Sequence, residues 1–127
     1  MAFFKRKKKK AAPQKEEKVI NKEEILTKIE QAKQGLEEAD AEDKISYLNQ
    51  IGSLYLEIED YDQAITYYET SISEKQEMGK AFADLTKLYN FKRKEASEQN
   101  DKEKVQYYLA KSDELMKLTK DTMRGNM

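Results

Sequence analysis

Carboxylates are the side chains of this sequence that are best suited to chemistry, and they concentrate in one stretch. Between residues 37 and 62 they are Glu37, Glu38, Asp40, Glu42, Asp43, Glu57, Glu59, Asp60 and Asp62. Paired carboxylates can act as general acid and base or bind a metal ion. These ones gather where helices are expected to begin, and capping together with the helix dipole already accounts for them there. We therefore interpret the acidic stretch as helix caps and solvated surface, with a docking surface for a basic partner as the alternative.

The residue types that are missing exclude most other catalytic chemistry. The 127 residues include neither cysteine nor histidine. Thiolate nucleophiles, disulfides, Ser-His-Asp triads and the common zinc sites therefore cannot form. The sequence also lacks the Asp-x-Asp-x-Asp-Gly pattern of a calcium loop. We predict that the protein is not an enzyme and that it uses no cofactor and no metal.

The first ten residues are the second chemically distinctive segment, which we call the leader. Phe3 and Phe4 precede six consecutive cations, which are Lys5, Arg6, Lys7, Lys8, Lys9 and Lys10. Each cation near an anionic membrane contributes about 1 kcal/mol, and a buried Phe adds about 1.5–3 kcal/mol. The leader thus predicts reversible membrane attachment, without myristoylation because residue 2 is alanine. Two alternatives stay open: phosphate contacts with nucleic acid, shared with the basic run 92–94, and a tail that only improves solubility.

Charge is distributed unevenly, although the formal net charge is only −1. Residues 1–36 carry a net charge of +6, residues 37–77 carry −10 and residues 78–127 carry +3. An acidic middle is therefore flanked by basic ends. No run of about 18 apolar residues is present, and no apolar region follows the basic N-terminus as in a signal peptide. We expect a cytoplasmic protein that is peripheral on the inner membrane face.

Hydrophobic periodicity and capping residues predict five helices, since 39% of the residues are charged and only one is proline. We place them at 21–40, 42–58, 61–75, 78–98 and 100–118. The expected N-caps are Asn21, Asp40 or Asp43, Asp60 and Asn100, with Glu24, Gln63 and Glu103 returning reciprocal hydrogen bonds. The chain then divides into a disordered basic tail (1–20), one helical domain (21–122) and a frayed C-terminus (123–127).

An internal repeat links the second and fourth of these helices. Leu48, Gly52 and Tyr55 share one helical face and recur 34 residues later as Phe82, Thr86 and Tyr89. Ile65, Tyr67 and Tyr68 recur 40 residues later as Val105, Tyr107 and Tyr108. The first offset matches the period of about 34 residues of one helical-repeat family. The second implies about six extra residues between the helices of the second unit, within 92–100.

With Asp60 in the turn and Tyr61 and Ala64 opening the next helix, these residues resemble the tetratricopeptide repeat family. The first unit carries the specific match, whereas the second is degenerate because Thr86 replaces the glycine and Lys104 the alanine. The resemblance implies an all-α fold of antiparallel helical hairpins, stacked as a short right-handed superhelix of about five helices. Its expected repeat core is Leu48, Gly52, Tyr55, Ala64, Tyr68, Phe82 and Tyr89.

The resemblance also implies a groove for a partner on the first helix of each unit. The matching positions are Asn49, Ser53, Leu56, Glu57, Lys80, Ala83, Lys87, Asn90 and Phe91. Such a groove takes a helix or an extended peptide, while a clamp for a C-terminal carboxylate is disfavoured because Asp84 would repel it. We expect a non-enzymatic adaptor or scaffold for protein–protein interaction. The alternatives are an RNA- or ribosome-associated factor and a self-associating structural protein.

Overall fold

The computed structural model describes residues 22–76 and 79–125, with side chains as far as residue 120. The leader, the rest of the predicted tail and the predicted cap Asn21 lie outside this part, as do residues 126–127. All the regular structure that is described is helical. It comprises a helix over residues 22–38, α2 (Ala41–Glu57), α3 (Tyr61–Glu74), α4 (Lys80–Glu98) and α5 (Lys102–Gly125). The prediction of an all-α fold with about five helices is confirmed, and α5 runs on to Gly125.

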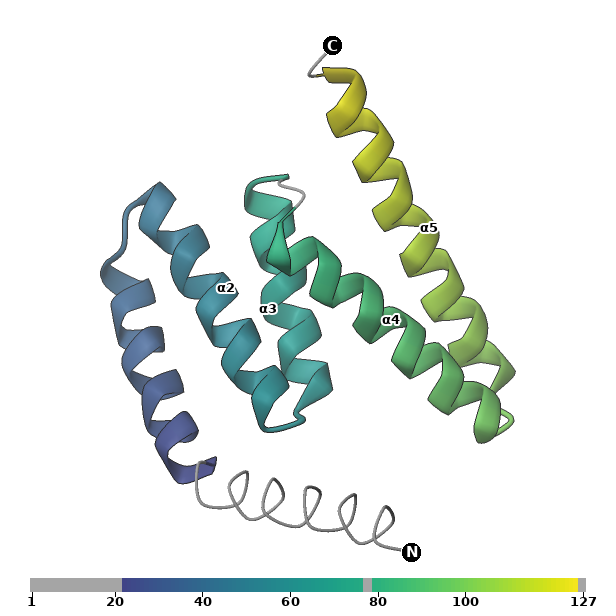
Figure 1. The fold of residues 1–127 in the computed structure, drawn as a ribbon, viewed down its shortest axis with the longest axis horizontal. Coiled ribbons are helices and arrows are strands. Elements are labelled where there is room, and N and C mark those ends of the chain that lie inside the picture. The colour runs from purple at the N-terminus through teal and green to yellow at the C-terminus, as the bar shows by residue number, and fades with distance from the viewer. Residues whose placement is uncertain (1–21, 77–78, 126–127) are drawn as a thin grey trace, which may run out of the picture.

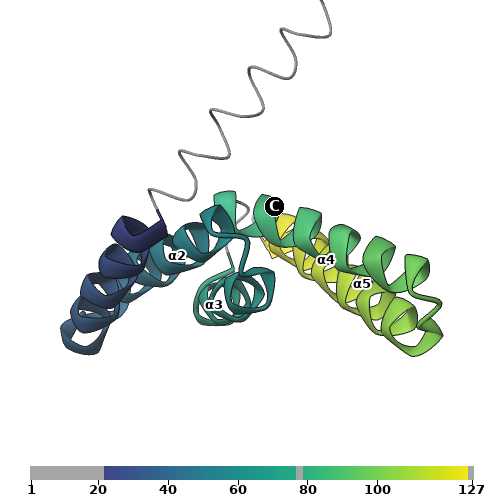
Figure 2. The same cartoon turned by 90° about the horizontal axis from the view of Figure 1, so that it is seen from below.

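The five helices follow one another as sequential antiparallel pairs (Figure 1). α2 packs along α3 and α4 packs along α5, while α3 joins the two hairpins by contacting α4. α2 also touches α4, over a shorter length. Figure 2 shows that α3 lies beneath α2 and α4, and that α5 lies beneath α4. The first helices of the two hairpins therefore share one side of the molecule.

Aspartates at the helix starts explain where α2 and α3 begin. Asp40 accepts a hydrogen bond from the backbone N–H of Asp43 at 3.0 Å, and Asp60 accepts one from that of Gln63 at 3.3 Å. Each bond satisfies a backbone donor that has no partner within the helix. The predicted reciprocal bond from Gln63 is replaced, because the backbone N–H of Asp60 donates to the carbonyl of Tyr55 at 3.0 Å.

The turns within the two hairpins have the same geometry. Glu59 and Asn100 adopt φ angles of 61° and 59°, the left-handed conformation that ends many helices. The residue after each turns its backbone N–H back to the preceding helix, as Asp60 does to Tyr55 and Asp101 does to Ala96. Asp101 then caps α5 by accepting a hydrogen bond from the N–H of Lys104 at 3.2 Å. The prediction of Asn100 as this cap is wrong, because Asn100 ends α4.

The extra residues of the second unit lengthen its helix and not its turn. Three buried positions of α2 are matched by buried positions of α4 exactly one repeat period later: Ile51 by Leu85, Leu54 by Leu88, and Tyr55 by Tyr89. The C-caps Ile58 and Gln99, in contrast, are 41 residues apart. α4 therefore continues about two turns beyond the point that corresponds to the end of α2. It begins at Lys80 after Gly79, two residues later than predicted.

The buried apolar side chains form one core that runs through every helix. Six of the seven predicted core residues are buried, and Phe82 is half-buried against them. Tyr68 is fully buried beneath Gly52, where an added Cβ would lie 2.9 Å from two carbons of the Tyr68 ring. Gly52 is therefore needed for the close approach of α2 and α3. Among the described side chains of α5, Leu115 is the one that is buried in this core.

Candidate functional site

The predicted groove residues separate into two groups in the structure. The side chains of Lys80, Ala83, Lys87 and Asn90 are exposed on α4, and Figure 2 shows α4 in the same layer as α2. On α2, the predicted residue Glu57 is exposed, whereas Ser53 and Leu56 are half-buried. We call the surface formed by these seven residues the α2–α4 face.

Two of the predicted groove residues contact α3 instead. Asn49 accepts a hydrogen bond from the hydroxyl of Ser71 and lines a cavity of about 620 Å³ together with Glu74. The ring of Phe91 packs on that of Tyr61, with centroids 4.7 Å apart. Both side chains thus lie at the junctions of α3 with α2 and with α4, away from the centre of the predicted groove.

A hydrogen-bonded polar group joins α3 to α4 at the α2–α4 face. The Tyr68 hydroxyl donates to Asp84 at 2.7 Å, and the Lys80 ammonium donates to the same carboxylate oxygen at 2.6 Å. Burial disfavours the charge of Asp84, but the hydrogen bonds from Lys80 and Tyr68 outweigh it and lower the pKa of the carboxyl. Burial, and then the hydrogen bond to Asp84, raises the pKa of Tyr68. The side chain of Asp84 is only 13% exposed, and its negative charge is paired with the positive charge of Lys80.

A cleft between α3 and α5 was not predicted from the sequence. It has a volume of about 340 Å³, an apolar floor on α4 and α5, and a polar rim. The floor consists of Leu85, Tyr89, Leu115 and Leu118, and the rim includes Glu69, Lys111 and Glu114. The helical phase of α5 could have placed Lys111 beside buried Leu115. The partner helix across the cleft could not be read from that phase.

Three polar side chains bridge the end of this cleft. The hydroxyl of Tyr89 donates to Glu69, and the ammonium of Lys111 lies 3.4 Å from the same carboxylate oxygen. Burial, and then the hydrogen bond to Glu69, raises the pKa of Tyr89. Burial lowers the pKa of Lys111, but the charge of Glu69 outweighs it and the pKa is raised. Glu69 thereby joins α3 to both helices of the second hairpin.

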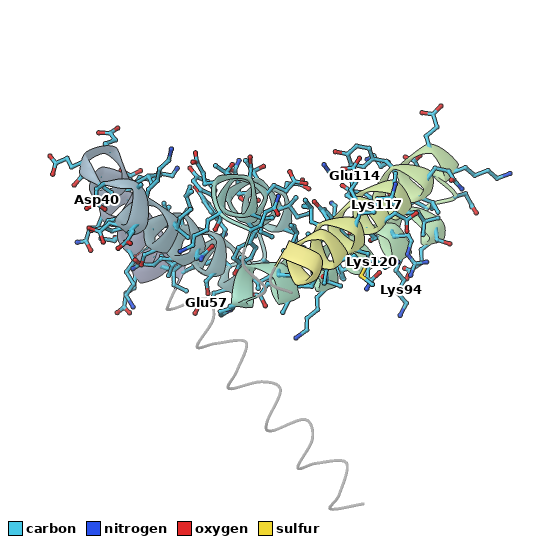
Figure 3. All side chains as sticks on the ribbon, turned by 90° about the horizontal axis from the view of Figure 1, so that it is seen from above. Asp40, Glu57, Lys94, Glu114, Lys117 and Lys120 are labelled. Carbon is cyan, nitrogen blue, oxygen red and sulfur yellow. The ribbon has the colours of Figure 1, made fainter. Side chains whose placement is uncertain are left out.

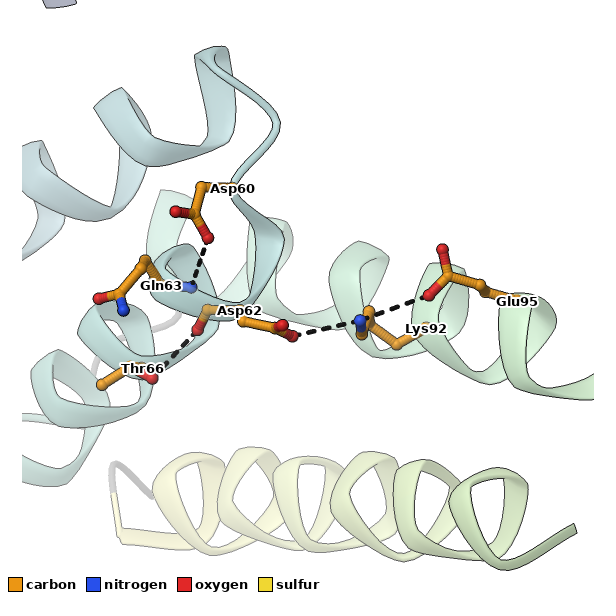
Figure 4. Close-up of polar contacts among 6 residues, drawn as sticks. All are labelled: Asp60, Asp62, Gln63, Thr66, Lys92 and Glu95. Atoms are coloured by element: carbon orange, nitrogen blue, oxygen red, sulfur yellow. Dashed lines mark hydrogen bonds and ion pairs between the residues drawn. The ribbon is translucent and has the colours of Figure 1, made fainter. Parts of the chain in front are cut away.

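The acidic start of α3 is held by the Asp60 cap and by an ion pair to α4 (Figure 4). Besides the Asp60 cap, Asp62 lies 3.2 Å from the ammonium of Lys92, which also pairs with Glu95 at 3.4 Å. The side chain of Lys92 is only 18% exposed. Lys92 is therefore committed to joining α3 to α4, which leaves Arg93 and Lys94 of the basic run that was predicted to track phosphates.

The two halves of the described chain carry opposite charge. Residues 22–76 contain 5 Lys/Arg and 14 Asp/Glu, a net charge of −9, whereas residues 79–125 contain 11 and 8, a net charge of +3. In Figure 3, Asp40 and Glu57 extend from the first half and Lys94, Lys117 and Lys120 from the second. Within these residues no three metal-ligating side chains gather into a group, and no helix has the length and apolarity needed to cross a membrane.

The geometry thus offers two surfaces of different character: the α2–α4 face with its polar floor, and the cleft between α3 and α5. The first was anticipated from the sequence and the second was not. Comparison with protein-family models, with curated proteins and with solved structures finds no match for this chain.

Proposed function

We propose that the protein is a non-enzymatic adaptor that binds a segment of another protein on the α2–α4 face. One observation carries this proposal: hydrogen bonds hold the polar floor of that face in place, while neighbouring side chains are exposed to solvent. Asp84, Tyr68 and Lys80 hold the floor by hydrogen bonds. Ala83 and Asn90 contribute to the exposed surface beside it. Pre-organised polar groups with exposed neighbours lower the ordering cost of binding a peptide or a helix.

The leader adds the second part of the proposal, which is reversible attachment to an anionic membrane surface. Its six cations and two phenylalanines supply an electrostatic and an apolar contribution to the same binding event. A segment that only contacts phosphates has no need of the phenylalanines. The ion pairs of Lys92 with Asp62 and Glu95 also leave the RNA alternative with fewer cations at positions 92–94. The adaptor would thus capture its partner at the membrane surface.

Site-specific photo-cross-linking in the native cell tests the binding face. A photoreactive amino acid replaces Ala83 or Asn90 in two variants, and exposed Thr70 of α3, in the opposite layer, in the control. We expect the same partner band from positions 83 and 90 and none from position 70. Equal cross-linking from all three positions, or from none, would contradict the proposed face.

Sedimentation with vesicles tests the leader separately. The full chain should pellet with vesicles that contain phosphatidylglycerol and stay in the supernatant with phosphatidylcholine alone. Removal of residues 1–10 should abolish the difference, and added salt should weaken it because the attraction is screened. If the full chain ignores anionic vesicles at low salt but binds RNA through residues 1–10, the membrane part of the proposal is wrong.

A further inference from the structure

An apolar stripe lies uncovered on the outer side of α5. Leu109 and Met116 are 39% and 54% exposed, and Val105 is half-buried beside them. The spacings of four and seven residues place all three on one helical face, with the small Ser112 between them. Single exposed apolar side chains are common, but a stripe along two turns and more is the pattern of a helix-packing seam.

The same chain shows how such a seam is covered. Forty residues earlier, the corresponding positions are Ile65, Glu69 and Ile72 on α3 and Gln76 just after its end. Ile65 and Ile72 are buried, and Glu69 contacts the next hairpin through Tyr89 and Lys111. These positions of α3 therefore face the following pair of helices.

The stripe on α5 faces the equivalent direction. With about 100° of rotation per residue, Leu109 and Met116 lie about 140–160° around α5 from Lys111, which points back to α3. α5 is the last described helix, and no described element covers the stripe. Leu109 and Met116 of α5 are apolar, whereas the residues forty positions earlier, Glu69 on α3 and Gln76 just after it, are polar. The exposed seam is thus more apolar than the covered one.

Cations flank the stripe. Lys102, Lys117 and Lys120 lie within about 100° of it around the helix, and none of them has an ion pair within the described part of the chain. Figure 3 shows Lys117 and Lys120 extending from this half of the molecule. Asp113 is the acidic exception on this side of α5. An apolar seam with a largely cationic border complements an apolar helix face that carries carboxylates.

Other occupants fit this surface less well. A second copy would have to offer an exposed apolar stripe, and the helix over residues 22–38 offers only Leu26 among the exposed large apolar side chains. Pairing α5 with itself would oppose like-charged borders. A membrane-bound helix needs a broad apolar face, whereas here Ser112 and Asp113 interrupt the apolar surface.

We infer that the outer face of α5, built on Leu109 and Met116 and bordered by Lys102, Lys117 and Lys120, binds an acidic amphipathic helix of a partner protein. The bound helix takes the place that the second hairpin takes on α3. This docking surface is separate from the α2–α4 face, so the adaptor presents two binding surfaces on two sides of its second hairpin.

The direct test is titration of the full chain with a synthetic helical peptide of about 18 residues. The peptide carries leucines at spacings of four, three and four with glutamates on both sides, and the control peptide carries lysine in place of every glutamate. Methyl NMR signals of Leu109 and Met116 report the site. We expect the glutamate peptide to shift both signals and the lysine peptide to leave them unchanged.

Matched variants separate this surface from general stickiness. Met116→Glu should weaken binding of the glutamate peptide by about tenfold or more, since it places a like charge in the seam. Leu26→Glu changes another exposed apolar residue, on the helix over residues 22–38, and should leave the affinity unchanged. Asp113→Lys should tighten binding by about threefold because it completes the cationic border. Thermal melting confirms that each variant is folded.

Four results would overturn the inference: no binding of the glutamate peptide at millimolar concentration, equal binding of both peptides, shifts of the Met116 signal caused by anionic vesicles alone, or a concentration-dependent dimer that Met116→Glu disrupts. The third would assign the stripe to a membrane and the fourth to a second copy. Cross-linking from positions 83 and 90 stays independent of all four. Failure here therefore leaves the proposed α2–α4 face untouched, and failure there leaves the α5 surface untouched.

Discussion

The two hairpins follow one plan but gain their stability differently. α2 and α3 approach each other at Gly52, where the missing Cβ makes room for the ring of Tyr68. In α4 the equivalent residue is Thr86, which is half-buried and donates to the carbonyl of Phe82. The second hairpin compensates with length, because α4 and α5 contain 19 and 24 residues against 17 and 14 in α2 and α3. The helices of the first hairpin thus pack by close approach, and those of the second pack along a greater length.

The hairpins differ equally in the surfaces that they leave to solvent. The first half is acidic and its forward seam on α3 is covered by the second hairpin. The second half is basic and its forward seam on α5 is exposed. The two hairpins therefore share matched buried positions, such as Ile51 and Leu85, and differ in the residues that they expose.

The substitution Gly52→Leu should cause the largest loss of stability and tests whether the first hairpin depends on close approach. The new side chain would have to displace the fully buried ring of Tyr68, so we expect a loss of about 3 kcal/mol in the free energy of unfolding. Urea denaturation followed by circular dichroism measures it. Gly35→Ala is the control, since its Cβ meets only the outer end of the half-buried Tyr47 side chain, which can move. An unchanged urea midpoint for Gly52→Leu would mean that the close approach of α2 and α3 is not required.

Removing a hydroxyl from each hairpin comes next in size. Tyr68→Phe should cost about 2 kcal/mol because it breaks a hydrogen bond to the mostly buried carboxylate of Asp84. Tyr89→Phe should cost about 1 kcal/mol, since Glu69 is 34% exposed and keeps Lys111 as a partner. Both values come from urea denaturation at neutral pH. A larger loss for Tyr89→Phe would show that the cleft, and not the floor of the α2–α4 face, is the more tightly held region.

Acid titration isolates the floor of the α2–α4 face. The folded pKa of Asp84 is lower than its unfolded value near 3.8, so its contribution is present above pH 3.8 and disappears as the pH falls through the folded value. Asp84→Asn should therefore be less stable than the natural chain by about 1–2 kcal/mol at pH 7. The gap should narrow below pH 3.8. Urea midpoints from pH 7 to pH 3 test this, and a constant gap would mean that ionised Asp84 does not stabilise the fold.

The sequence was sufficient for features that depend on neighbouring residues. Asp40 and Asp60 could be identified as caps because each is a short polar residue just before a segment with helical spacing of apolar residues, which is the pattern of a helix start. Asn100 could not be separated from Asp101, since asparagine suits both a cap and the left-handed residue that ends a helix. In the structure the end of α4 decides between them: Asn100 takes the left-handed conformation after α4, and Asp101 follows as the cap of α5.

Features that depend on the angle between helices could not be predicted. The family resemblance implied that Asn49 and Phe91 line the groove, but in the structure both side chains contact α3, and a resemblance between repeat positions does not give that packing. The extra residues within 92–100 were detected by comparing repeat offsets, which say nothing about whether they form helix or loop. The cleft between α3 and α5 joins Glu69 and Lys111, which lie 42 residues apart, and so it emerges only from the packing of the two hairpins.

The smallest expected effect concerns the feature that the hairpins share most closely, the left-handed residue of each turn. Glycine adopts this conformation without the steric cost that a Cβ brings. Glu59→Gly should therefore stabilise the protein by about 1 kcal/mol, whereas Asn100→Gly should add only about 0.3 kcal/mol because asparagine already tolerates the conformation. Thermal melting of the two variants measures the difference.

Glu59→Ala is the control for the lost side chain. It removes the same carboxylate as Glu59→Gly but keeps a Cβ at a φ of 61°, so it should give none of the stabilisation. If Glu59→Ala raises the melting temperature as much as Glu59→Gly does, the gain comes from reduced acidic repulsion in the turn and not from the backbone. If Asn100→Gly then matches Glu59→Gly, the two turns are equally strained and asparagine confers no advantage on the second. We expect the melting temperature to rise most for Glu59→Gly, less for Asn100→Gly and not at all for Glu59→Ala. This order follows if glutamate is more strained than asparagine in the same left-handed conformation.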